Sequence, residues 1–128
     1  MDAENKKYDI QKRENHTLIK VLVEKLDTNI APALKSELVL IAGNGEKNMI
    51  IDLNECRYCD SSGLSAILVG NRLCKGSQGT FVITGVQDAV ERLISISQLN
   101  QVLNIVPTLE EAVEFLFMEE IERDVNNE

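Results

Sequence analysis

The polar string Asp60-Ser61-Ser62-Gly63 is the part of the sequence whose residue types could carry out or receive chemistry. It follows a short apolar run at 49–53 and precedes a segment with helical spacing, so we expect it between a strand and a helix. Functional residues of open α/β sheets gather at the carboxyl ends of strands. Asp and Ser are also preferred helix caps, so the string alone leaves a pure capping role open.

A catalytic role for these serines lacks the necessary partner. A serine nucleophile needs a general base, and the only histidine, His16, lies at the start of an expected strand much earlier in the chain, where we expect it to face solvent. Neither of the Gly-rich phosphate-binding motifs is present. We therefore expect no catalytic residue and no cofactor, and weak binding of ATP or GTP at most. The acidic groups at 110–111, 119–120 and 122 are expected to be solvated helix faces.

The three cysteines are expected to be reduced, because their number is odd and no secretory signal is seen. Cys56 and Cys59 form a C-x-x-C spacing, but a redox pair should open a helix, and here Asp60 and Ser61 open it. Without a second pair or a nearby histidine, the spacing does not predict a metal site. We expect buried structural thiols, Cys74 included, and keep an enzyme using the Cys56–Cys59 pair as an alternative.

The charge balance excludes several classes of partner. Thirteen basic and 21 acidic residues give a formal net charge of −8, which disfavours nucleic acid and anionic membrane surfaces. No stretch approaches the roughly 18 apolar residues of a membrane span, and residues 1–7 have no apolar signal core. We expect a cytoplasmic protein without membrane insertion.

The spacing of apolar residues predicts one α/β domain over residues 1–128, with a core at about 8–122 and a frayed tail at 124–128. Strands are predicted at 8–12, 17–23, 49–53, 80–84 and, as a short edge, 103–106. Helices are predicted from 30 to a stop at 43–45 behind capping side chains at 27–29, from 60 to about 76, over 86–94 and over 109–121. Strand–helix–strand connections imply parallel neighbours. The prediction is a mixed sheet of four to five strands packed with about four helices.

Residues 50–53 and 56–64 resemble the phosphorylation segment of the STAS domain, which bacterial anti-sigma factor antagonists share with the cytoplasmic tails of sulfate transporters. The likeness continues in order through the Leu26-Asp27 turn, the strand and turn at 81–86 and the closing helix from Thr108. Cys56 and Cys59 stand where the family has apolar core residues. Glu24-Lys25 is a departure, because a glycine and a glutamate commonly precede the leucine–aspartate turn.

The resemblance implies an anti-sigma factor antagonist. Its unphosphorylated form would bind an anti-sigma factor with serine kinase activity and release a sigma factor. Phosphorylation of Ser62, with Ser61 as the second candidate, would end the binding, and a phosphoserine phosphatase would restore it. The alternative is a STAS subunit of an ABC-type, lipid-trafficking transport complex, in which the serines are structural.

The resemblance also assigns roles within the docking surface. Asp60 would hold the loop or contact the partner, Ser61 would cap the helix, and Gly63 would admit a partner's backbone. The implied docking residues are Asp27, Asp60, Ser61, Ser62 and Gly63.

Overall fold

Five strands form one mixed sheet in the computed structural model, which describes residues 6–127. In spatial order they are β1 (Tyr8–Lys12), β2 (Thr17–Val21), β4 (Met49–Asp52), β6 (Phe81–Thr84) and β7 (Asn104–Val106). β1 runs antiparallel to β2, and the remaining neighbours are parallel. A second, parallel sheet pairs the two-residue strands β3 (Lys25–Leu26) and β5 (Tyr58–Cys59). The sheet confirms the predicted mixed architecture, whereas the sequence pattern did not predict the β3–β5 pair.

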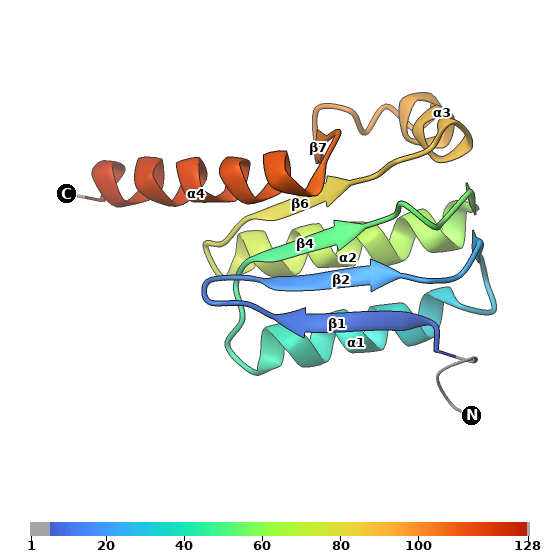
Figure 1. Ribbon diagram of the computed structural model, residues 1–128, viewed down its shortest axis with the longest axis horizontal. Coiled ribbons are helices and arrows are strands. Elements are labelled where there is room, and N and C mark those ends of the chain that lie inside the picture. Colours follow the sequence, from blue (N-terminus) through green and yellow to red (C-terminus); the bar gives the residue numbers. More distant parts are fainter. Residues whose placement is uncertain (1–5, 128) are drawn as a thin grey trace.

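The helices cover the sheet on both faces (Figure 1). α1 (Ala31–Gly43) and α2 (Ser61–Gly76) pack side by side on one face, α3 (Asp88–Ile96) follows β6, and α4 (Leu109–Asn126) lies on the other face. The central strands are apolar on both sides, because alternate side chains point into two different cores. Ile51 belongs to the large core under α1 and α2, whereas Ile50 meets Ala112 and Leu116 of α4.

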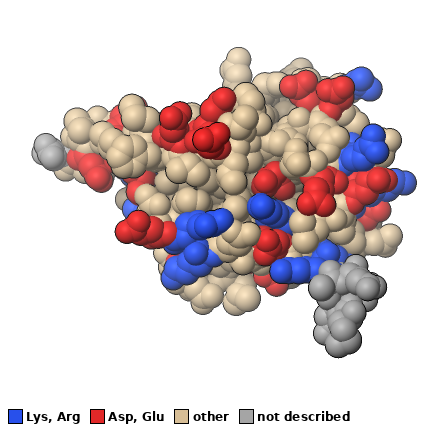
Figure 2. Space-filling view, in the orientation of Figure 1, with Lys and Arg blue, Asp and Glu red and all other residues tan. Residues whose placement is uncertain are grey.

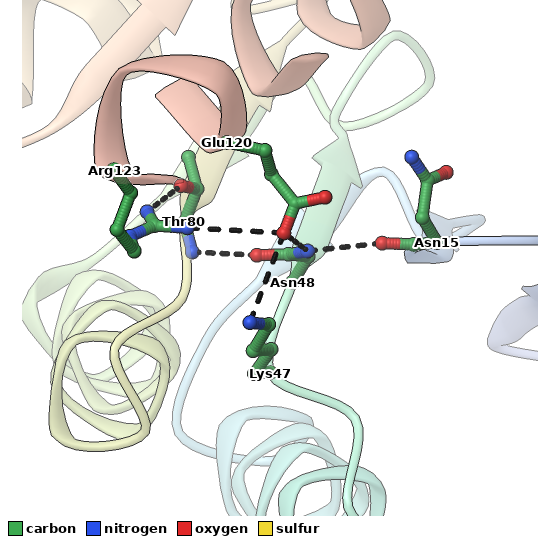
Figure 3. A network of polar contacts seen from close by, with 6 residues as sticks. All are labelled: Asn15, Lys47, Asn48, Thr80, Glu120 and Arg123. Atoms are coloured by element: carbon green, nitrogen blue, oxygen red, sulfur yellow. Dashed lines mark hydrogen bonds and ion pairs between the residues drawn. The ribbon is translucent and has the colours of Figure 1, made fainter. Parts of the chain in front are cut away.

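A polar network ties α4 to the ends of the strands that it crosses (Figure 3). The buried Asn48 side chain donates to the Asn15 carbonyl at 3.0 Å and to Glu120 Oε2 at 3.2 Å, and it accepts from the Thr80 N–H at 2.8 Å. Arg123 donates to the Thr80 hydroxyl at 2.6 Å and lies 3.8 Å from Glu120 Oε2. Glu120 is thus part of a network rather than the solvated residue that the sequence predicts.

Two further expectations are wrong. His16 is only 7% exposed, in the turn between β1 and β2, and its buried Nδ1 has no hydrogen-bond partner within residues 6–127. The last helix continues through Asn126, so the expected frayed tail is helical from 124 to that point. Residues 1–5 and Glu128, which the sequence analysis placed in the domain, lie outside the described residues. Within residues 6–127, no helix is both long and apolar enough to cross a membrane.

Candidate docking site

The β3–β5 pair brings together the two loops that lead into α1 and α2. Because the pairing is parallel, Asp27 after β3 and Asp60 after β5 emerge at the same end of this small sheet. The Asp60 N–H donates to the Leu26 carbonyl at 3.2 Å, which fixes the two loops to each other. Two predicted site residues that are 33 positions apart in sequence therefore lie in one place.

Asp60 caps α2. Its backbone is extended, and its Oδ1 accepts from the Gly63 N–H at 3.0 Å, the bond that an N-cap side chain makes. Ser61 is the first helical residue and is exposed, so the capping role expected for Ser61 belongs to Asp60. Among the residues that the structure describes, the Ser61 hydroxyl has no hydrogen-bond partner, and it is exposed to solvent.

Ser62 is half-buried in the first turn of α2, as predicted, and its hydroxyl has a neighbour that the sequence analysis missed. Ser62 Oγ lies 3.2 Å from Thr28 Oγ1, and the same Thr28 hydroxyl lies 3.5 Å from Asp60 Oδ2. Thr28 therefore bridges the expected phosphoacceptor and the helix cap. An exposed threonine in a loop gives little indication of a role by itself. The clue in the sequence was that Thr28 directly follows the Leu26-Asp27 turn.

Asp27 shapes the entry to α1 through a turn rather than through a helix cap. Its Oδ1 accepts from the Asn29 N–H at 3.0 Å, and its carbonyl accepts from the N–H groups of Ile30 and Ala31. The N-cap position is Ile30, without a side-chain hydrogen bond, so the side-chain caps expected at 27–29 do not form. The turn fixes Thr28 beside α2.

The close backbone approach expected at Gly63 exists, but it occurs within the chain. Gly63 is buried, and a Cβ there would lie 2.3 Å from the Leu26 carbonyl oxygen and 2.7 Å from Cys59 Sγ. A larger residue would push the β3–β5 sheet away from α2. Gly63 thus supports the site from beneath.

Two open clefts flank the loop pair, each of about 520 Å³. The first lies over the β3–β5 sheet and includes Glu24 and Lys25, the pair that differs from the residues expected before the leucine–aspartate turn. It is lined by Glu24, Lys25, Leu26, Asp27, Tyr58, Cys59 and Asp60. The second runs between α1 and α2 and has five hydroxyl side chains and one cation; it is lined by Thr28, Ala31, Pro32, Lys35, Ser36, Ser61, Ser62 and Ser65. Both phosphoacceptor candidates therefore face a groove that a partner can enter.

The cysteines are placed as structural residues. Cys56 and Cys74 are buried and Cys59 is partly buried; all three are free thiols. Burial raises the pKa of Cys56, and it raises the pKa values of Cys59 and Cys74 to about 12. A reactive cysteine needs a lowered pKa, so these environments oppose the enzymatic alternative. Residues 6–127 also contain no group of three or more His, Cys, Asp or Glu side chains that could hold a metal ion.

Comparisons with known proteins identify the family of this chain. The STAS domain family model matches residues 7–112, so this chain belongs to the STAS domain family. An anti-sigma-B factor antagonist of Bacillus subtilis is 27% identical over 97 residues, which are 76% of this chain and 87% of that protein.

Solved structures share the fold at low sequence identity. An anti-sigma factor antagonist STAS domain protein from Planctomyces limnophilus superposes with a TM-score of 0.78 at 17% identity, covering 85% of this chain and 97% of that one. The phosphorylated form of the Bacillus cell fate determinant SpoIIAA gives a TM-score of 0.66 at 17% identity, covering 84% and 96%.

Proposed function

We propose that this protein is an anti-sigma factor antagonist that works by docking and is not an enzyme. Its unphosphorylated form binds an anti-sigma factor with serine kinase activity and thereby releases a sigma factor. Phosphorylation of Ser62 ends that binding, and a phosphoserine phosphatase resets the protein. The docking surface consists of Asp27, Asp60, Ser61, Ser62 and the Thr28 loop, with Gly63 supporting it.

The observation that carries this proposal is the position of the Ser62 hydroxyl. It lies in the first turn of a 16-residue helix, in an open groove, and beside the Thr28 hydroxyl. A helix N-terminus tolerates a phosphate because its N–H groups are unpaired and its dipole end is positive. The domain itself can therefore accept the modification, so the change in charge acts on the partner.

Within residues 6–127 no histidine lies beside Ser62, which supports the role of substrate rather than catalyst. Among the described residues, its hydroxyl has one hydrogen-bond neighbour, Thr28, and the only histidine is buried in the turn between β1 and β2. The serine thus lacks the hydrogen-bonded histidine that commonly activates a serine nucleophile. The relatives named as antagonists, and the solved phosphorylated form of SpoIIAA, support the same assignment.

The test is affinity capture from the native host with wild-type protein and the Ser62→Asp variant as baits. We expect a serine kinase that also binds a sigma factor on the wild-type bait and little of it on the variant. Mass spectrometry of the tryptic peptide 58–72 should place phosphate on Ser62. An ATP-binding transport subunit captured equally by both baits would favour the transport alternative, and phosphate on Ser61 alone would contradict the assigned switch.

A further inference from the structure

The outward face of α4, away from the sheet, carries a row of exposed apolar side chains interspersed with carboxylates. Its apolar side chains recur every four residues, one helical turn apart, with Met118 beside them. Their exposed fractions lie between 41% and 62%; the residues are Val113, Phe117, Met118, Ile121 and Val125. Ala112 and Leu116, on the opposite side of the same helix, are buried against the sheet. The helix therefore has apolar side chains on two sides, of which the domain covers one. We call the five exposed residues the outer stripe.

The network at the ends of the strands fixes which face of α4 points outward. Glu120 is held by Asn48 at 3.2 Å and lies 3.8 Å from the Lys47 ammonium, and Arg123 is held by Thr80 (Figure 3). Together with Leu116 in the core, these contacts prevent rotation of the helix about its axis. The C-terminal half of α4 also extends beyond the strands (Figure 1). The outer stripe is thus held in a fixed position and accessible.

Uncompensated negative charge lies among and beside the residues of the outer stripe. Five exposed carboxylates fall in the same half of the helix by their spacing, and none of them makes an ion pair within residues 6–127; they are Glu110, Glu111, Glu114, Glu122 and Asp124. The one basic residue of α4, Arg123, is turned toward Thr80. Figure 2 shows acidic side chains along the surface formed by α4, at the upper left.

From this arrangement we propose that the outer stripe is a second docking surface, which binds a basic amphipathic helix of a partner protein. Exposed apolar helix faces recognise the apolar face of a partner helix, and flanking lysines or arginines would neutralise the five carboxylates. A second copy of this chain does not fit, because it would bring two acidic faces together. An anionic membrane is disfavoured for the same reason.

The outer stripe is independent of the proposed switch. α4 packs on the sheet face opposite α1 and α2, so the sheet separates it from the Ser62 groove. A partner on α4 and a partner at Ser62 need not displace each other. The proposed docking role at Ser62 can be wrong while the α4 surface is real, and the reverse also holds.

The experiment uses a defined probe, a labelled synthetic helix with leucine on one face and lysine on the other. A matched peptide has glutamate in place of lysine. Fluorescence anisotropy should show that the full chain binds the lysine peptide and not the glutamate peptide, with affinity falling as salt is added. Amide shifts in ¹H–¹⁵N spectra should concentrate at residues 110–125 and leave residues 60–65 unchanged.

Matched variants distinguish specific binding at the outer stripe from non-specific hydrophobic binding. Phe117→Ser should weaken lysine-peptide binding about tenfold or more, as loss of an aromatic anchor does. Ile96→Ser, which removes a 72% exposed apolar side chain on α3, should leave it unchanged. Glu114→Gln/Glu122→Gln should weaken binding, and Glu91→Gln should not. Circular dichroism checks that each variant is folded. Equal binding by the Phe117→Ser variant, shifts outside α4, or self-association of the wild type through α4 in sedimentation would overturn the proposal.

Discussion

Gly63 in α2 and the Leu26 carbonyl in β3 are packed so closely that there is no room for a side chain between them. A Cβ on Gly63 would lie 2.3 Å from that oxygen. We expect Gly63→Ala to lower the free energy of unfolding by about 1–3 kcal/mol, because the backbone of β3 or the start of α2 must move. Gly76→Ala is the matched control, since nothing lies within 4 Å of its added Cβ. Urea denaturation that gives the two variants equal stability would contradict this packing.

A negative charge at Ser62 should impair docking without harming the fold. The first turn of α2 favours an anion, so we expect Ser62→Asp to change the free energy of unfolding by no more than about 0.5 kcal/mol. Like-charge contacts at an interface cost several kcal/mol, so binding to the kinase partner should weaken at least about tenfold. Titration calorimetry and thermal melts measure the two effects. Ser61→Asp compares the two candidate serines: the switch is misplaced if Ser61→Asp impairs binding and Ser62→Asp does not.

Thr28 should position the Ser62 hydroxyl for phosphorylation. Its Oγ1 lies 3.2 Å from Ser62 Oγ, and this link is lost in Thr28→Val. On the proposed function, we expect kcat/KM for phosphorylation of Ser62 to fall by a factor of about 2–10, because the acceptor is less well oriented. Thr28→Ser keeps the hydroxyl and should restore the rate. A Thr28→Val rate equal to that of the wild type would leave Thr28 without this role.

The three thiols should be nearly inert in the folded protein. Burial raises the pKa values of Cys59 and Cys74 to about 12 and also raises the pKa of Cys56, so few thiolates exist near pH 8. We expect reaction with a thiol reagent to be slow in buffer and complete in urea. Rapid modification of one or two thiols in the native state would bring back the enzymatic alternative for the Cys56–Cys59 pair.

His16 should make the fold less stable in mild acid. Burial lowers the pKa of its imidazole below the ordinary histidine value of about 6.5, and the nearby Arg13 lowers the pKa further. In mild acid the unfolded chain binds a proton on His16 more readily than the folded chain does. The contribution of neutral His16 to the free energy of unfolding is therefore complete above about pH 6.5 and is lost as the pH falls toward the pKa of the folded state. Denaturation of wild type and His16→Gln at several pH values tests this. The wild type should lose more stability between about pH 7.5 and pH 5.5, above the range where carboxylates titrate.

The strand–helix alternation and the position of the serines could be predicted because the signals are local. Apolar runs such as 49–53 and helix signals such as Asp60 or Thr108 each act over a few neighbouring residues. Once the strand, the loop and the helix are placed, Ser62 must lie in the first turn of α2. Which of Ser61 and Asp60 caps the helix became clear only from the structure, in which the Gly63 N–H donates a hydrogen bond to Asp60.

What escaped prediction depends on contacts between distant residues. β3 and β5 have two residues each, too few for a strand pattern, and they form only because each pairs with the other. Glu120 looks like a solvated helix residue until it meets Asn48, 72 positions away. His16 looks exposed because its sequence neighbours are polar, although the fold buries it. Local periodicity carries no information about such partners.

The position of α4 has a consequence for synthesis on the ribosome. α4 is made after all the strands that it covers, and among the described helices it is the one that packs on the sheet face formed by Leu18, Ile50 and Val82. Until residues 109–126 have left the exit tunnel, that apolar face has no cover, and a chain released early would expose it to other nascent chains. Truncations within α4 should therefore leave this sheet face exposed and yield protein that chaperones retain and proteases remove.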